Sequence, residues 1–190
     1  MDIEDAIYKR RTIRRFKQDP VKLEILKQLV DFGRVAPMGS NIQSVEYIIV
    51  TDKAKRENIF PLLAWAGYLP DKYRHPEPDR RPTAYIIVLV NTNIKQSAEM
   101  DVGAAIENIL LGALKFGLGS CWMGSIDREK LREIFHIPKD YKILNVISLG
   151  YPDEKSVKEP FNGSFKYWKD DEGVMHIPKR DLDDIIFKIY

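Results

Sequence analysis

The chain has 190 residues, 44% hydrophobic and 31% charged, a composition typical of one globular domain over residues 1–190. Lys and Arg number 30 against 28 Asp and Glu, so the net charge of +2 favours neither nucleic acid nor an anionic membrane as a partner. One cysteine excludes a disulfide framework, the acidic start lacks a signal-peptide core, and no uncharged stretch reaches the ~18 residues of a membrane span, so a cytoplasmic protein is expected.

Helical and strand-like patterns alternate in the first half of the chain. Residues 3–7 have helical spacing, and a second amphipathic helix is predicted over about 22–34. The β-branched runs 47–50 and 85–90 are typical of strands buried on both faces. Between them, the charged and proline-rich residues 67–82 predict a long excursion over the surface.

The second half continues the alternation and ends in a hairpin and a helix. The predicted elements are a long helix over 97–116 with a small-residue face, a short strand or turn at 120–124, a helix from the N-cap Asp127 to Phe135, a strand over 141–149, a hairpin within 165–177 and an amphipathic helix over 182–189. Together these elements predict an α+β fold of three layers, α/β/α.

Three arginines cluster where the first helix ends. Arg10, Arg11 and Arg14 lie within five residues, with the hydroxyl of Thr12 between them. Guanidinium groups are planar forks of N–H donors that match phosphate oxygens. The alternative is a solvated basic patch that complements the negative end of the helix, and this run alone does not decide between the two.

An amide-rich loop follows the second helix. Its members offer donors and acceptors suited to the edge of a planar heterocycle, and they are Pro37, Met38, Gly39, Ser40, Asn41 and Gln43. The alternative is a plain helix-to-strand connection.

Taken together and in order, five stretches resemble the nitroreductase family. Residues 10–14 resemble its R-R-S-x-R element, and residues 37–43 resemble its P-S-x-x-N-x-Q-P-W loop. Residues 101–111 resemble the helix pattern D-x-G-x-A-x-x-N-x-x-L, and residues 117–124 resemble the turn G-L-G-S-x-W-x-G. The basic residues within 177–180 resemble those near the C-terminus of the family.

The resemblance implies a fold with a central, mostly antiparallel sheet flanked by helices, non-covalently bound FMN, and NADH or NADPH as electron donor. It also implies a homodimer with FMN at the interface. The residues implied to contact the phosphate are Arg10, Arg11, Thr12, Arg14, Lys179 and Arg180. The loop 37–43 is implied to lie along the ring, with Asn41 and Gln43 orienting it, and the backbone of Met123 and Gly124 is implied to donate near N5 and O4.

Three departures from the family pattern concern the substrate. Ser44-Val45 stands in place of Pro-Trp, Met123 stands where several relatives carry Glu, and the 67–82 excursion lies outside the pattern. Its aromatic residues Tyr68 and Tyr73, with Trp65 just before, are expected either to line the substrate site or to pack the loop onto its own domain.

Other kinds of site lack their signatures. The three histidines are far apart in sequence without ligand spacing, so no metal is expected. The sequence has neither a G-x-G-x-x-G fingerprint nor a G-x-S-x-G elbow, and Cys121 and Trp122 are expected in the core. A flavin carries the redox chemistry itself, so no catalytic side chain is expected.

The resulting hypothesis is hydride transfer from NAD(P)H through flavin N5 to a small acceptor such as a quinone or nitro compound, with ping-pong kinetics. Two alternatives stay open at this stage. One is a specialised relative that performs flavin fragmentation or reductive dehalogenation, and the other is a flavin carrier or sensor without turnover.

Overall fold

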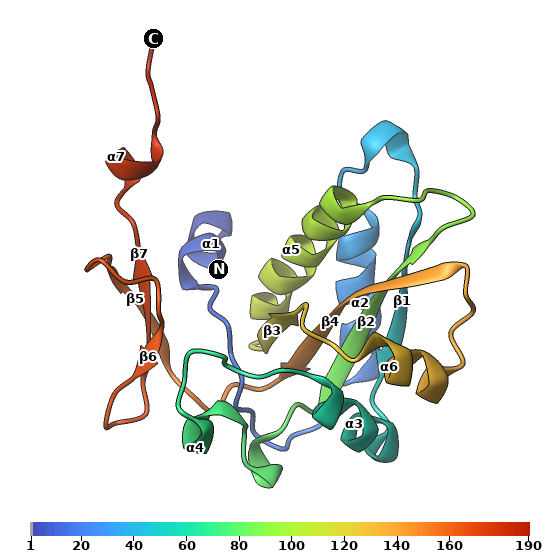
Figure 1. Ribbon diagram of the computed structural model, residues 1–190, viewed down its shortest axis with the longest axis horizontal. Helices are drawn as coiled ribbons and strands as arrows, with labels where there is room; N and C mark the ends of the chain where they lie inside the picture. Colours follow the sequence, from blue (N-terminus) through green and yellow to red (C-terminus); the bar gives the residue numbers. More distant parts are fainter. Residues whose placement is uncertain (1) are drawn as a thin grey trace.

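The computed structural model describes residues 2–190. Its elements in chain order are α1 (Ile3–Lys9), α2 (Leu23–Arg34), η1 (Gly39–Asn41), β1 (Val45–Val50), α3 (Lys53–Ile59), η2 (Phe60–Leu62), α4 (Asp71–Arg74), η3 (Pro78–Arg80), β2 (Ala84–Asn91), α5 (Glu99–Lys115), β3 (Gly119–Met123), α6 (Arg128–Phe135), β4 (Tyr141–Gly150), β5 (Ser156–Pro160), β6 (Trp168–Lys169), β7 (Met175–Lys179) and α7 (Leu182–Ile185). Figure 1 shows their arrangement. Within residues 2–190, no helix combines the length and apolarity needed to cross a membrane.

A four-stranded antiparallel sheet in the order β1-β2-β4-β3 forms the middle layer. The inner strand β2 is buried along almost its whole length, because helices cover both of its faces. Ile86 and Val88 point to one core and Ile87 and Leu89 to the other, as the two-residue period of a strand requires. The predicted three-layer α+β fold is confirmed.

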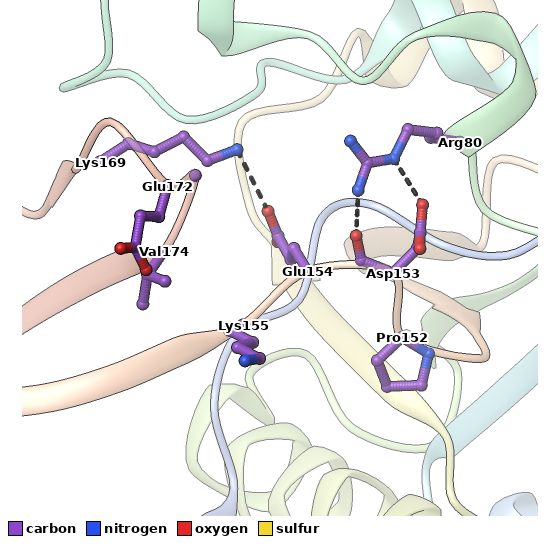
Figure 2. Close-up of a pocket in the computed structure, with 9 residues that line it drawn as sticks. Arg80, Pro152, Asp153, Glu154, Lys155, Lys169, Glu172 and Val174 are labelled. Atoms are coloured by element: carbon purple, nitrogen blue, oxygen red, sulfur yellow. Dashed lines mark hydrogen bonds and ion pairs between the residues drawn. The ribbon is translucent and has the colours of Figure 1, made fainter.

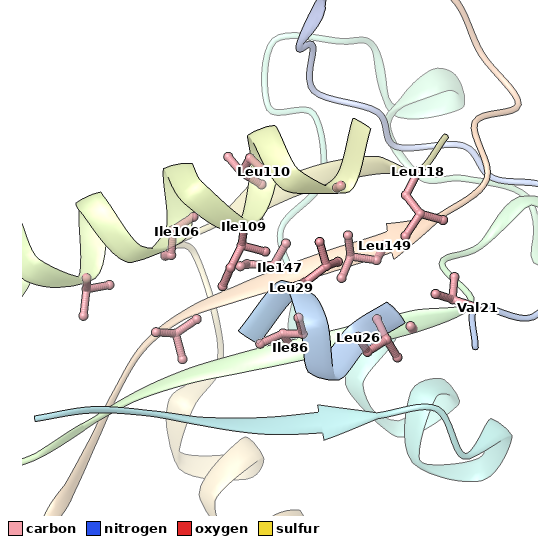
Figure 3. Close-up of a cluster of buried hydrophobic side chains, with 14 of the residues drawn as sticks. Val21, Leu26, Leu29, Ile86, Ile106, Ile109, Leu110, Leu118, Ile147 and Leu149 are labelled. Carbon is pink, nitrogen blue, oxygen red and sulfur yellow. The ribbon is translucent and has the colours of Figure 1, made fainter. Parts of the chain in front are cut away.

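Helices α2 and α5 cover one face of the sheet. Figure 3 shows Leu29 of α2 and Ile109 of α5 beside Ile86 and Ile147 of the strands. The helices approach closely at Gly112, where an added Cβ would overlap the ring of Phe32 on α2. The expectation of a small-residue face on the long helix is therefore confirmed.

Helices α3 and α6 lie over the opposite face, above a second core cluster. Asp127 caps α6 as expected, because its carboxylate accepts the Lys130 N–H at 3.1 Å. Helix α3 was not predicted, because Ile59 is the one buried side chain among its seven residues and no apolar periodicity marks it.

The C-terminal region forms a separate three-stranded sheet in the order β5-β7-β6. The predicted hairpin is confirmed by the antiparallel pair β6 and β7, whereas the parallel strand β5 was not predicted.

His176 of β7 lies between two carboxylates, with Nδ1 3.1 Å from Glu159 and Nε2 3.0 Å from Asp170. Its ring stacks on Trp168 at a centroid distance of 4.1 Å, and both carboxylates, Asp170 foremost, raise the pKa of His176.

The predicted helix over 182–189 is wrong beyond Ile185. Helix α7 has four residues, Ile186 is already extended, and the chain then leads away from the body (Figure 1). Phe187 and Tyr190 are fully exposed. A segment this short does not hold a helix in water unless its apolar face packs against something, so periodicity alone was insufficient.

Candidate functional site

The arginine run is fixed beside strand β3. Thr12 forms a parallel bridge with Ser120, and the Ile13 N–H donates to the Ser120 carbonyl at 2.9 Å. Gly119 allows this approach, because a Cβ there would lie 2.8 Å from Ile13 Cβ. Two stretches singled out in the sequence, 10–14 and 117–124, are thus adjacent in space.

Arg10 and Arg11 turn their guanidinium groups in different directions. Arg10 Nε lies 3.2 Å from a carboxylate oxygen of Glu107 on α5. Arg11 folds back on the end of α1 and donates to the carbonyls of Arg10 and, at 2.6 Å, Tyr8. Arg11 therefore makes the contacts expected of a helix-end charge, and burial, together with the positive charge of Arg10, lowers the pKa of Arg11.

Arg14 points in a third direction, toward the C-terminal region. Its backbone N–H donates to Glu154 Oε1 at 2.5 Å, and its guanidinium lies 4.9 Å from the ring centroid of Tyr167. The Nη1 atom of Arg14 is buried and has no hydrogen-bond partner among residues 2–190. A buried donor left unpaired is costly and uncommon, which makes this atom a candidate contact for a ligand.

A buried ionic cluster that the sequence did not indicate supports the arginine run from behind. The Arg15 side chain is 3% exposed and donates to Glu77 at 2.8 Å and to the Tyr73 carbonyl at 3.1 Å. Glu154, 2% exposed, lies 3.8 Å from both Arg15 Nη1 and Lys169 Nζ. Arg15 lowers the pKa of Glu77, and burial lowers the pKa of Lys169.

Figure 2 shows the cavity next to this cluster, between the body of the protein and the C-terminal sheet. Its volume is about 450 Å³, and it is lined by Arg80, Pro152, Asp153, Glu154, Lys155, Lys169, Glu172, Gly173 and Val174. Arg80 Nε pairs with Asp153 at 2.6 Å, so much of the charge on the wall is already compensated. This mixed lining differs from the cationic site predicted for a phosphate.

The amide-rich loop forms the short helix η1 at the N-terminal end of α5. Pro37, Gly39, Ser40, Asn41 and Gln43 are exposed, and Met38 is half-buried. Ser40 and Asn41 both have a φ of 54°, in the left-handed region. The Gly39 N–H donates to Asp101 Oδ1 at 3.0 Å, and Lys95 Nζ lies 2.6 Å from Asp101 Oδ2.

Met123 is the last residue of β3, and Gly124 follows it in the turn. Met123 is 5% exposed and belongs to the second core cluster, and Gly124 is exposed. Cys121 is buried as expected, and burial raises the pKa of its thiol, which argues against a nucleophile. Trp122 was expected in the core, but its side chain is 42% exposed and lies over Gly103 of α5, where the sheet edge leaves that face uncovered.

The basic residues at the end of β7 lie near the end of α1. Lys179 and Arg180 line a cavity of about 500 Å³ together with Tyr8 and Lys158. Lys158 Nζ lies 4.8 Å from the Tyr8 ring centroid, and Arg11 donates to the Tyr8 carbonyl. The C-terminal basic residues therefore approach the arginine run through Tyr8, a residue that carried no sequence signal.

The three expected substrate-lining aromatic residues lie in different surroundings. For Trp65 the substrate-lining alternative is wrong and the packing alternative is confirmed, because Trp65 is 1% exposed, stacks on Phe60 and donates to its carbonyl at 3.4 Å. Tyr68 and Tyr73 are exposed. Tyr68 packs edge-on against Tyr167 at 5.1 Å, so Tyr167 links the 67–82 excursion to Arg14.

Comparison with known proteins gives the relationship directly. Residues 7–151 match the sequence profile of the nitroreductase family. A protein of Archaeoglobus fulgidus named "Putative NADH dehydrogenase/NAD(P)H nitroreductase" is 32% identical over 162 residues, which cover 80% of this chain and 87% of that protein. An NADPH-dependent oxidoreductase of Staphylococcus aureus is 28% identical over 208 aligned positions, covering 99% and 82%.

Solved structures agree with the sequence comparison. An FMN-dependent nitroreductase of Clostridium difficile superposes with a TM-score of 0.67 at 25% identity, covering 84% of this chain and 92% of that one. The profile match spans most of the chain, over the same residues that build the central sheet and the arginine run. This chain belongs to the nitroreductase family.

Proposed function

We propose that this chain is an FMN-dependent oxidoreductase that uses NAD(P)H to reduce a small oxidising acceptor such as a quinone or a nitro compound. Membership of the nitroreductase family supports the flavin and the nicotinamide donor, as do relatives described as an FMN-dependent nitroreductase and an NADPH-dependent oxidoreductase. The observation that carries the proposal is the buried Nη1 atom of Arg14, which lacks a partner within residues 2–190. An acceptor oxygen of FMN would satisfy it.

The other residues available near the run also suit FMN. Burial and then the positive charge of Arg10 lower the pKa of Arg11, and a dianionic phosphate would offset both by pairing with the guanidinium groups. We assign the phosphate to the basic and hydroxyl side chains Arg10, Arg11, Thr12, Lys179 and Arg180. We assign the ring edge to the exposed polar residues of loop 37–43, with Arg14 donating to an FMN oxygen.

When bound, FMN supplies the redox chemistry, accepting hydride at N5 from NAD(P)H and passing electrons to the acceptor. The chain binds the group, orients it and controls access to one face. Met123 and Gly124 contribute backbone N–H groups, since the Met123 side chain is buried in the core. Tyr68 and Tyr73 on the 67–82 excursion are exposed and would restrict the entry of substrates to that face. Trp65 is buried and would take no part.

Steady-state kinetics on the purified chain test this function. The protein is expected to be yellow, to release FMN on denaturation, and to give parallel double-reciprocal lines over a grid of NAD(P)H and quinone concentrations. The reason is that one open flavin face cannot present N5 to donor and acceptor together. A colourless protein that fails to bind added FMN contradicts the proposal, and FMN binding without turnover indicates a carrier. Intersecting double-reciprocal lines would mean that donor and acceptor are bound at the same time, which overturns the proposal that they use one flavin face in turn.

We also propose that the site is completed by a second copy of this chain. Gly39 contacts Asp101 in the first turn of α5, whereas Arg10 contacts Glu107, six residues or about 1.7 turns later. The step from Asp101 to Glu107 advances the helix by about 9 Å and rotates the side-chain direction by about 240°. Within one chain, loop 37–43 and the arginine run therefore contact different faces of α5. Every residue of α1 is exposed or half-buried, and Phe187 and Ile189 extend into solvent.

Sedimentation velocity is expected to give a homodimer for the full chain. Replacing both Phe187 and Ile189 with serine is expected to shift it toward monomer, because a dimer interface would bury these apolar side chains. The matched control is Met100→Ser, which removes an exposed apolar side chain on α5. A wild-type monomer that still holds FMN contradicts the proposal.

A further inference from the structure

We infer that Asp101 is a positioning residue that holds loop 37–43 in the conformation that contacts the cofactor. This inference rests on the proposed function, because it assigns a role within the same site. Asp101 lies in the first turn of α5, is almost wholly buried, and reaches the loop through a single backbone contact.

The loop adopts a conformation that its residues do not favour. Ser40 and Asn41 follow each other with φ values of 54°, and neither is glycine. A left-handed backbone is unfavourable for an L-residue, and asparagine tolerates it better than serine. Two local bonds, Asn41 N–H to the Met38 carbonyl at 2.9 Å and Ile42 N–H to the Gly39 carbonyl at 3.1 Å, close the turn without attaching it to the rest of the protein.

Asp101 supplies that attachment. Its Oδ1 accepts the Gly39 N–H at 3.0 Å, immediately before the two left-handed residues. A carboxylate in the first turn of a helix is stabilised by the free N–H groups there, which keeps this acceptor charged. Side chains on the loop stay exposed while its backbone is anchored, which is the arrangement that a pre-organised binding loop requires.

Lys95 maintains the charge of the nearly buried carboxylate. Its ammonium lies 2.6 Å from Asp101 Oδ2, and it is also beside the loop, since a Cβ on Gly39 would be 3.2 Å from Lys95 Nζ. The hydrogen bond from Lys95, followed by that from Gly39, lowers the pKa of Asp101. The stabilisation is therefore present at neutral pH and is lost only as the pH falls through this lowered pKa.

The test combines amide hydrogen exchange with FMN titration on the full-length chain. Asp101→Ala is expected to speed exchange of the Gly39 amide and to raise the Kd for FMN, each by about tenfold to a hundredfold, the range of a hydrogen bond to a charged group. Asp101→Asn keeps an acceptor oxygen and is expected to restore part of both losses. Glu99→Ala is the matched control, because Glu99 lies in the same turn and pairs at 2.6 Å with Lys142 instead of the loop.

A variant at Lys95 covers the case in which Asp101→Ala does not fold. Lys95→Met removes the main cause of the lowered pKa, so Gly39 protection and FMN affinity are expected to decline at a higher pH than in the wild type. Unchanged Gly39 exchange in Asp101→Ala, or faster exchange with unchanged FMN affinity, overturns the inference. Wild-type protein that binds no FMN overturns the proposed function instead, whatever the exchange rates are.

Discussion

Replacing Glu154 with alanine is expected to lower the free energy of unfolding by about 3–5 kcal/mol, which makes it the most damaging single truncation considered for this fold. The Glu154 side chain is 2% exposed and lies 3.8 Å from Arg15 and from Lys169, whose side chains are 3% and 10% exposed. Its loss leaves buried positive charge less compensated and leaves the Arg14 N–H without its acceptor. Urea unfolding followed by circular dichroism measures the change.

Two control variants separate buried charge from charge in general. Glu154→Gln keeps the volume and an acceptor oxygen for the Arg14 N–H, so an intermediate loss is expected. Asp31→Ala removes a carboxylate whose partner Arg34 is on the same helix, in a pair more than half exposed on both sides. Such surface pairs contribute about 0–1 kcal/mol. Equal losses for Glu154→Ala and Asp31→Ala would show that the cluster does not stabilise the fold.

The sequence could not reveal this cluster, although it predicted most of the elements around it. The helix expected over 22–34 is observed at Leu23–Arg34, and Asp127 caps α6, because periodicity and capping are local properties. Arg15, Glu154 and Lys169 lie on segments far apart in the chain, and charged residues are ordinarily exposed. Only the fold brings them together.

The predicted site shows the same division between local pattern and long-range placement. The motifs predict which stretches surround the proposed site, and the bridge from Thr12 to Ser120 brings two of these stretches together. Sequence spacing did not predict that the guanidinium groups of neighbouring arginines diverge, and it left open whether Trp65 lines the site or packs in the core, where the structure places it. Side-chain direction depends on neighbours such as Glu107, which the motif does not specify.

Replacing Arg14 with alanine is expected to raise the Kd for FMN by about tenfold to a hundredfold, the range for charge-assisted hydrogen bonds. The expected loss of folding stability is smaller, about 0.5–2 kcal/mol, because the side chain contributes a cation–π contact with Tyr167 and a weak contact with the Cys121 thiol. The unpaired Nη1 atom adds no hydrogen bond to residues 2–190 that truncation would remove. Quenching of FMN fluorescence during titration measures the affinity, and urea unfolding without FMN measures the stability.

Three further variants decide whether the effect belongs to the guanidinium of Arg14. Arg14→Lys keeps the charge but loses the planar fork, so an intermediate affinity is expected. Arg10→Ala should also weaken binding, by about tenfold or less, because Arg10 must exchange its contact with Glu107 for the phosphate. Arg34→Ala is the surface control, since its partner Asp31 lies on the same helix. If Arg14→Ala binds FMN as tightly as Arg34→Ala does, the buried Nη1 donor does not contact the cofactor. The unpaired Nη1 atom then no longer supports the proposed function.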